Sequence, residues 1–343
     1  MKFLRYILFP FAIIYDVVTR IRNFCFNVGV FKETTFQIPV LVVGNLSVGG
    51  TGKTPQIEYL IRLLKDSYKT SVLSRGYGRK TKGFLLVNNS HTAEEVGDEP
   101  LQYDNKFSNI DVAVDANRVE GISSLINNQS PEVILLDDAF QHRKVKGSFY
   151  ILLTKYNDLF TDDFLLPTGN LRESRSGAKR ADVIVVTKCP EDLSQQAKQK
   201  LKNKLQKYNK QVFFTTISYD EKTSGSQNIS IDDLKKYEVI LVTGIANPKP
   251  MLSFLNQKVV NFKHLKFADH HHFSEKEIEM IKSEYEDLQS SKKIILTTEK
   301  DYVRLSNKIA EISYLGIQTA FLFDQEQQFN KIVTTHIQQN QRY

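Results

Sequence analysis

The chain has 343 residues, which is long enough for about two domains and a sizeable core. Hydrophobic residues make up 41% of it and charged residues 25%, and these fractions exclude an intrinsically disordered chain. The net charge of +7 favours an anionic partner, but the basic residues are scattered and form no recognised nucleic-acid module, so we expect a nucleotide or an acidic lipid surface and no nucleic acid.

The first segment, 1–30, is apolar and aromatic but contains charges at Arg5, Asp16, Arg20 and Arg22. It therefore cannot comfortably span a bilayer, and it lacks the small-residue cleavage site of a signal peptide. A helix is predicted over 11–26, opened by Pro10, with an apolar stripe formed by Ile13, Ile14, Val17, Val18, Ile21 and Phe24. Such a helix either packs on the body or lies in a membrane interface. The aromatic lead segment and basic flank favour the interface.

A hydrophobic strand from Val40 leads directly into a glycine-rich turn that ends in Gly-Lys-Thr. Backbone N–H groups of such a turn converge on phosphate oxygens, while Lys53 would neutralise their charge and the Thr54 hydroxyl would bind Mg²⁺. The usual pattern has a glycine at the position of Ser47. We predict a nucleoside triphosphate held by Ser47, Val48, Gly49, Gly50, Thr51, Gly52, Lys53 and Thr54.

Helices and strands alternate after this turn. The expected helices are 56–64 and 118–126, and the expected strands are 70–74, 110–114, 133–136, 150–153 and 183–186. This alternation predicts an α/β fold of the phosphate-loop type, in which a parallel sheet has helices on both faces and its functional sites at the carboxyl ends of the strands.

The second half of the chain begins with a polar helix, 194–211, a strand, 212–218, and a polar loop, 221–231. A second alternation follows, with strands at 239–242, 259–262 and 294–296 and a helix at 275–288. The predicted organisation is an N-terminal amphipathic helix over 1–30, a nucleotide-binding core over 31–220 and a smaller α/β lobe over 221–343 that contributes to the active-site cleft. Cys25 and Cys189 have neither metal-ligand nor redox spacing, so we expect reduced thiols of a cytosolic protein.

Two pairs of carboxylates are candidates for the chemistry. Asp137 and Asp138 end a buried strand, where a phosphate-loop enzyme places its Mg²⁺ ligands, although aspartate there is also a common helix cap. Asp98 and Glu99 precede a helix expected from Pro100 and could supply a base and a metal ligand, or form a plain turn. Consecutive histidines cannot all face one ion, so the segment 269–272 is expected to supply one catalytic or substrate-facing imidazole.

This chain lacks two sequence motifs that guanine-binding switches require. Phe140 stands where the glycine after the second strand is required, and the segment 187–190 lacks the aspartate that reads the base. GTP is therefore disfavoured and ATP is the expected nucleotide.

The ordered motifs of the chain resemble those of the tetraacyldisaccharide 4'-kinase family. They are 44–45 (GN), 49–55 (GGTGKTP), 74–79 (SRGYGR), 97–100 (GDEP), 137–143 (DDAFQHR), 166–173 (LPTGNLRE), 244–248 (GIANP), 269–271 (DHH) and 297–301 (TTEKD). The resemblance implies ATP- and Mg²⁺-dependent phosphorylation of the 4'-hydroxyl of an acylated disaccharide 1-phosphate, during lipid A assembly. It also implies a peripheral position on the cytoplasmic face of the inner membrane, and we expect a monomer.

The same resemblance implies residue roles. Asp98 would be the general base and His270 its partner, while Arg172 would contact the γ-phosphate beside Lys53. Thr54, Glu99, Asp137 and Asp138 would form or support the metal site. Substrate-facing polar positions would be Asn45, Arg75, Arg118, Gln141 and His142. Ala139 stands where the family usually has glycine. The alternative from another class is a membrane-associated ATPase switch, which would hydrolyse ATP without a lipid acceptor.

Overall fold

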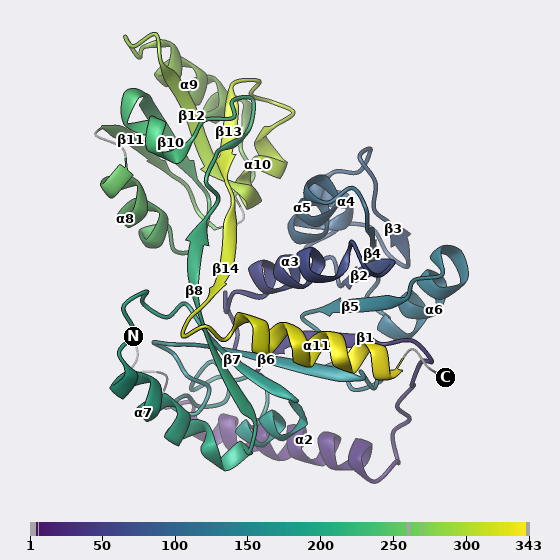
Figure 1. Cartoon of the computed structure of the whole chain (residues 1–343). Coiled ribbons are helices and arrows are strands. Elements are labelled where there is room, and N and C mark those ends of the chain that lie inside the picture. The colour runs from purple at the N-terminus through teal and green to yellow at the C-terminus, as the bar shows by residue number, and fades with distance from the viewer. Residues whose placement is uncertain (1–4, 6, 259–260, 270, 341–343) are drawn as a thin grey trace.

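The computed structural model describes residues 5, 7–258, 261–269 and 271–340, which form two sheets joined by two long strands (Figure 1). The larger sheet has nine strands in the order β14-β8-β7-β6-β1-β5-β2-β4-β3. In that order the strands are Ile317–Phe321, Gln211–Tyr219, Val183–Thr187, Phe149–Lys155, Val40–Asn45, Val133–Asp137, Thr70–Ser74, Asp111–Val114 and Leu85–Leu86. All neighbours are parallel except the two edge strands, β14 and β3. The predicted α/β class is confirmed.

The central strands are buried on both faces because their sequences are almost continuously apolar. Leu41 and Val43 of β1 belong to the core beneath three helices: α3 (Lys53–Leu64), α5 (Asp98–Lys106) and α11 (Glu326–Asn340). Val40 and Val42 alternate to the opposite face, which is covered by α6 (Arg118–Gln129). On that same face α7 (Gln195–Leu205) packs over β6 and β7. Helix α5 begins at Asp98, two residues before the expected start.

The smaller sheet has the order β11-β10-β12-β13-β9, or Phe262–Lys266, Glu238–Thr243, Lys293–Thr298, Ile312–Leu315 and Ser224–Gly225. Its helices are α8 (Lys249–Lys258), α9 (Glu275–Glu286) and α10 (Glu299–Leu305). The strand expected over 259–262 is displaced, since β11 begins at Phe262, and residues 259 and 260 lie outside the described residues. The remaining short elements are α4 (Ala93–Val96) and three 3₁₀ helices, Arg175–Arg180, Gln206–Tyr208 and Ile231–Lys236.

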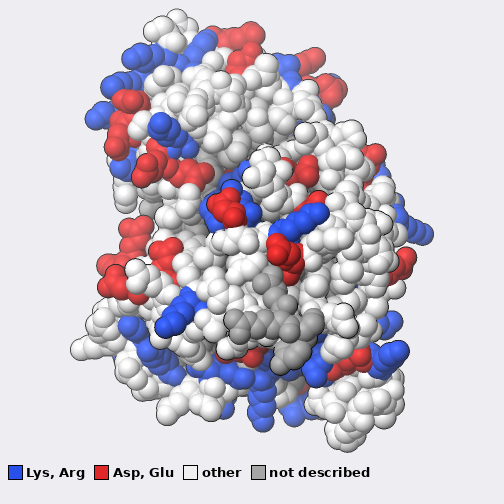
Figure 2. Space-filling view, turned by 45° about the vertical axis from the view of Figure 1, so that its right-hand side comes forward, with Lys and Arg blue, Asp and Glu red and all other residues white. Residues whose placement is uncertain are grey.

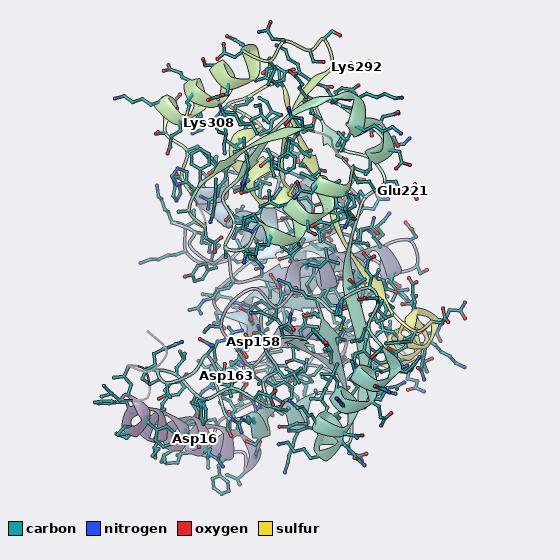
Figure 3. All side chains as sticks on the ribbon, turned by 90° about the vertical axis from the view of Figure 1, so that its left-hand side faces the viewer. Asp16, Asp158, Asp163, Glu221, Lys292 and Lys308 are labelled. Atoms are coloured by element: carbon teal, nitrogen blue, oxygen red, sulfur yellow. The ribbon has the colours of Figure 1, made fainter. Side chains whose placement is uncertain are left out.

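The C-terminal end of the chain returns to the larger sheet. Strand β14 pairs antiparallel with β8, and Phe329, Val333 and Ile337 of α11 lie in the main core beneath β1. Glu221, near the point where β8 ends, lies at the junction of the two lobes in Figure 3, whereas Lys292 and Lys308 lie far out on the smaller lobe. The lobe predicted over 221–343 is therefore corrected at its C-terminal end, because residues 317–340 pack with the larger sheet.

The N-terminal helix α2 (Phe9–Asn27) turns its predicted apolar stripe away from the protein. The six stripe residues are between 50% and 62% exposed, while Ala12, Thr19 and Phe26 face the body. Among the described residues, no helix combines the length and apolarity needed to cross a bilayer. Lysine and arginine side chains gather along the lower edge of the face in Figure 2, at the end of the molecule where α2 and α7 lie in Figure 1.

Candidate active site

The turn between β1 and α3 has the backbone of an anion site. Gly49 and Gly52 adopt positive φ angles of 94° and 86°, which favour glycine because it lacks a Cβ. Gly52 is the N-cap of α3 and supplies no side-chain cap, so the first N–H groups of the helix remain available to an anion. The Thr187 hydroxyl donates to the Thr51 carbonyl at 2.7 Å, and Lys188 Nζ donates to the Gly50 carbonyl at 2.8 Å. These bonds hold the turn open.

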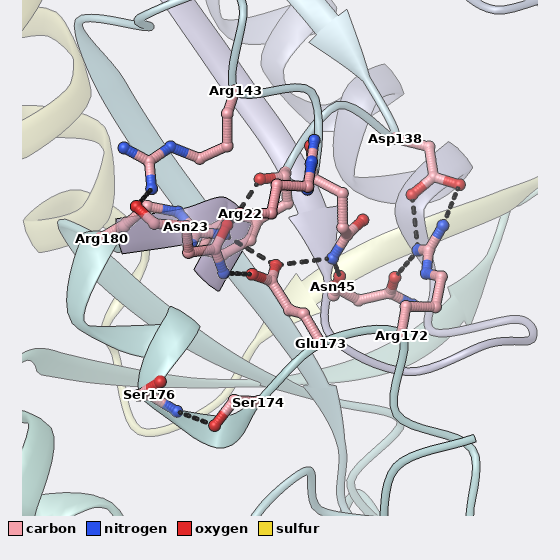
Figure 4. A network of polar contacts seen from close by, with 12 residues as sticks. Arg22, Asn23, Asn45, Asp138, Arg143, Arg172, Glu173, Ser174, Ser176 and Arg180 are labelled. Atoms are coloured by element: carbon pink, nitrogen blue, oxygen red, sulfur yellow. Dashed lines mark hydrogen bonds and ion pairs between the residues drawn. The ribbon is translucent and has the colours of Figure 1, made fainter. Parts of the chain in front are cut away.

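Two cations converge on one carboxylate beside this turn, and Figure 4 shows the pair that Arg172 forms with Asp138. Arg172 donates to both oxygens of Asp138, at 2.8 and 3.1 Å, and Lys53 Nζ lies 3.5 Å from Oδ2. Burial opposes ionisation of Asp138, but Lys53 and Arg172 outweigh it and lower the pKa of this carboxyl. Arg172 also donates to Asn45 Oδ1, and Asn45 Nδ2 donates to Thr51 Oγ1 at 2.6 Å. The predicted residues Lys53, Asp138, Arg172 and Asn45 therefore form one cluster.

The neighbouring carboxyl group of Asp137 has the opposite electrostatics. Burial, the charge of Asp138 and the charge of Glu99 raise its pKa to about 7. Ser74 Oγ donates to Oδ2 at 3.3 Å, while Oδ1 is buried without a hydrogen-bond partner in the described structure. Because Oδ1 is buried and has an unused lone pair, it can bind a cation. The negative charges of Asp138 and Glu99 also favour a positive charge beside this carboxyl group. A divalent cation requires a donor of this kind.

The side chains behind this cluster connect it to α2 (Figure 4). Gln141 Nε2 donates to the Asn45 carbonyl at 2.7 Å and to Glu173 at 3.0 Å, and Arg180 also donates to Glu173, at 2.7 Å. Asn23 of α2 reaches the other oxygen of Glu173 at 3.1 Å. The predicted residue Gln141 thus holds the end of β1, where the turn begins, through a hydrogen bond to the backbone.

Asp98 lies on a different element and has a partner from the smaller lobe. Its side chain is 3% exposed, and Arg304 of α10 donates to its two oxygens at 2.7 and 2.9 Å. Arg304 also donates to the carbonyl of His271 at 3.0 Å, which brings the histidine segment close to Asp98. His270 lies outside the described residues.

The comparisons with known proteins show the family of this chain. The family model described as tetraacyldisaccharide-1-P 4'-kinase (LpxK) matches residues 4–338. This chain belongs to the tetraacyldisaccharide 4'-kinase family. It is 51% identical to the kinase of Flavobacterium johnsoniae, with 99% of each chain covered, and 42% identical to that of Bacteroides thetaiotaomicron, covering 98% of this chain and 94% of the relative. The crystal structure of LpxK from Aquifex aeolicus, described as an "apo" form in complex with ATP, superposes with a TM-score of 0.79 at 31% identity, covering 97% of this chain and 99% of that one.

The remaining substrate-facing positions expected of this 4'-kinase family member lie at the same edge of the sheet. Arg75 is exposed at the end of β2, and its positive charge helps to lower the pKa of both Arg118 and His142. Arg118 is 2% exposed and donates to the Asp115 carbonyl at 2.7 Å, and burial lowers its pKa to about 10. Burial and Arg118 lower the pKa of His142 to about 4, so this imidazole is neutral. Arg118 therefore shapes the turn after β4 from within.

The alanine at position 139 fits this kinase turn without strain. The residue that adopts the left-handed conformation is Asp138, with φ 48°, and Ala139 is buried beside it at 3% exposure. Ala139 itself does not adopt a positive φ, so no glycine is required at this position.

Sequence analysis missed three groups of this site. Arg304 was not identified, although it follows the 297–301 motif on the same helix, and Glu173 was read only as part of a motif. Lys155 and Lys188 approach the turn after β1: a side chain at Gly49 would come within 3.9 Å of Lys155 Nζ, and one at Gly50 within 3.9 Å of Lys188 Nζ. The sequence did contain a signal for Lys155 and Lys188, since each stands at the end of one of two neighbouring strands, β6 and β7.

Proposed function

We propose that this chain transfers the γ-phosphoryl group of ATP to the 4'-hydroxyl of tetraacyldisaccharide 1-phosphate, giving the 1,4'-bisphosphate. The observation that carries the proposal is the convergence of Lys53 and Arg172 on Asp138, beside the turn that opens α3. Two cations and a helix N-terminus at one point match the charge of a triphosphate, and the family membership names the acceptor.

ATP would occupy the turn over residues 47–54. The N–H groups of this turn would bind the β- and γ-phosphates, and Lys53 and Arg172 would balance charge on the γ-phosphoryl oxygens as it spreads during transfer. Both cations pair with Asp138 in the structure, so Asp138 holds them in place for the phosphates.

Mg²⁺ fits the residues beside the turn. Thr54, Asp137 and Asp138 would hold it, with Glu99 in support, and the unbonded Oδ1 of Asp137 is the atom that fits this role best. Within the described part of the chain no three His, Cys, Asp or Glu side chains gather closely enough to hold an ion by themselves, so phosphate and hydroxyl oxygens would have to complete its shell. The bound ion would neutralise negative charge on the phosphates.

Asp98 would accept the proton of the sugar hydroxyl as the new oxygen–phosphorus bond forms. The bidentate contact with Arg304 fixes the orientation of the carboxylate that would take the proton. His270 would be the partner of Asp98 from the smaller lobe. The proposal is supported by the contact of Arg304 with the carbonyl of the next residue, His271.

The acceptor would reach the site from a membrane surface on the cytoplasmic side. Helix α2 presents six half-exposed apolar side chains outward, and the neighbouring edge of the molecule is rich in lysine and arginine, which suits an interfacial helix on an anionic membrane. The acyl chains of the acceptor would stay in the bilayer while its sugar enters the cleft.

The test incubates the purified protein in mild detergent with γ-labelled ATP, Mg²⁺ and tetraacyldisaccharide 1-phosphate, and follows label in lipid and in free phosphate. We expect label in lipid. Asp98→Asn should lower turnover about a hundredfold or more. Asp104→Asn, which changes another acid of α5, should leave turnover nearly unchanged. Label released only as phosphate, independent of lipid, would contradict the proposal in favour of an ATPase switch.

A further inference from the structure

Helices α5 and α10 lie against each other across the junction of the two lobes, and ion pairs join them at both ends. Asp98, at the first residue of α5, pairs with Arg304 near the end of α10. Lys106, at the last residue of α5, pairs with Glu299 at the first residue of α10. The helices therefore run antiparallel. One ion pair is at the proposed base, and the other is at the opposite end of the two helices.

The pair at the far end is a buried charge network. Lys106 Nζ donates to Glu299 Oε1 and to Glu58 Oε2 of α3, the latter at 2.7 Å. The side chains of Glu58, Lys106 and Glu299 are 1%, 13% and 7% exposed. The other oxygens are also bonded, since Gln102 donates to Glu58 Oε1 at 2.8 Å and the N–H of Ile317 donates to Glu299 Oε2 at 3.0 Å.

Lys106 is the cation that makes this arrangement possible. Burial and the charge of Glu58 raise the pKa of Glu299, and Lys106 opposes that rise. The two carboxylates outweigh burial and raise the pKa of Lys106. Arg62 also bonds Glu58, at 3.1 Å, so Glu58 keeps a cation when Lys106 is removed. Glu299 would then retain only the Ile317 N–H among the partners described here.

The network connects the parts that must meet for phosphoryl transfer. Glu58 belongs to the helix that opens at the phosphate-binding turn, Lys106 belongs to the helix that carries Asp98, and Glu299 belongs to the helix that carries Arg304. Ile317 is the first residue of β14, one of the two strands that join the lobes. Buried ion pairs define a specific arrangement more than they add stability, because desolvation offsets their attraction.

We propose that Lys106 and Glu299 are positioning residues, which fix α10 against α5 so that Arg304 meets Asp98. The inference rests on the proposed phosphoryl transfer and adds that the alignment of the base is set at the far end of the two helices. Without Lys106, the carboxylates of Glu58 and Glu299 repel each other, α10 moves away from α5, and Arg304 loses its contact with Asp98. The phosphate-binding turn, at the start of α3, keeps its shape.

The test compares Lys106→Met, which keeps the apolar stem of the side chain to within one atom but removes its charge, with Lys106→Arg. Lys204→Met is the matched control, since it removes an ion pair between half-exposed partners, Lys204 and Asp162. Three quantities are measured: kcat for lipid phosphorylation, Kd for a non-hydrolysable ATP analogue, and amide hydrogen exchange over 98–106 and 299–305. Lys106→Met should lower kcat about tenfold or more, change Kd by less than about threefold, and speed exchange in those two helices. Lys106→Arg should recover part of kcat, and Lys204→Met should resemble the wild type.

The double variant Lys106→Met/Glu299→Gln distinguishes the loss of the ion pair from the cost of burying an unpaired charge. It also replaces the single variant in these measurements if that variant fails to fold. It removes the orphaned carboxylate, so it should recover thermal stability while kcat stays low. A double variant with wild-type kcat would overturn the proposal, because pairing would then be unnecessary. Exchange that rises equally in both sheets of Lys106→Met would also overturn it. A wild-type protein that phosphorylates no lipid would instead refute the proposed function, while the exchange data would still test the ion pair.

Discussion

Asp137→Asn should make the metal-free protein more stable at pH 8 while reducing its activity. The carboxyl group of Asp137 is buried, and its pKa rises from 3.8 to about 7 on folding, through burial and the charges of Asp138 and Glu99. Between those two pH values the folded protein keeps a proton that the unfolded chain has lost. Stability therefore falls as pH rises through this window, by about 1.4 kcal/mol per pH unit and about 4 kcal/mol in all.

Asparagine has nearly the same shape but no charge to desolvate, so the stability gained by the substitution should depend on pH. We expect a gain near zero at pH 4 and up to about 4 kcal/mol at pH 8. Urea unfolding in buffer containing EDTA, at pH 4, 6 and 8, measures the difference between the variant and the wild type at each pH. Titrations common to both proteins cancel in this difference.

Asp138→Asn provides the control, since its effect should have the opposite sign. Lys53 and Arg172 lower the pKa of Asp138, so its ionised form contributes stability above the ordinary pKa of an aspartate, and that stability is lost as pH falls. The asparagine variant should be destabilised at pH 8. An Asp137→Asn gain that is equal at pH 4 and pH 8, or a loss of stability at pH 8, would refute the reasoning about buried charge.

Three further predictions concern other parts of the molecule. Lys53→Met should weaken ATP binding by about tenfold and lower turnover further, because the lost cation serves both bound ATP and the transition state; calorimetry with ATP and the label-transfer assay measure the two effects, and unchanged turnover would exclude the role. Ile14→Ser/Ile21→Ser should weaken binding to anionic vesicles by about 2 kcal/mol, or about thirtyfold, since each half-exposed side chain offers about 1 kcal/mol of further burial. The melting temperature of that variant should not change, and equal vesicle affinity in a sedimentation assay would argue against the interfacial position of α2. Gly44→Ala should cost about 1–3 kcal/mol in urea unfolding, because its Cβ would lie 2.6 Å from Phe140 Cβ; a variant as stable as the wild type would mean that the strand can shift there.

Local sequence signals predicted the central strands and the phosphate-binding turn well. Strand β2 has the expected bounds, 70–74, and β5 extends the expected 133–136 by one residue, to Asp137. Strand β5 is a short apolar run that ends in an aspartate, and β2 has two apolar residues between hydroxyl side chains. Both strands are buried in a parallel sheet, so the local pattern and the final structure agree.

Contacts between distant segments could not be predicted in this way. The pairing of β14 with β8 joins Phe321 to Thr215, and it moves the end of the chain out of the smaller lobe. Arg304 and Asp98 are separated by 206 positions, and nothing near Arg304 in the sequence specifies a carboxylate from another helix. The predicted roles of Asp98 and His270 came from resemblance alone, and they stay predictions.

The two surfaces of α2 link the proposed membrane contact with the proposed nucleotide site. Its exposed face is apolar, whereas its inner face makes polar contacts: Tyr15 donates to the carbonyl of Arg172 at 2.8 Å, and Asn23 donates to Glu173 at 3.1 Å. The backbone of the arginine proposed to contact the γ-phosphate is therefore bonded to the helix proposed to lie in the membrane. Because Arg172 N also donates to the Leu46 carbonyl at 2.7 Å, the phosphate-binding turn joins the same frame. A lipid whose acyl chains stay in the bilayer would thus meet a phosphate site at a fixed height above it, and alignment of the smaller lobe through α5 and α10 is the remaining requirement for transfer.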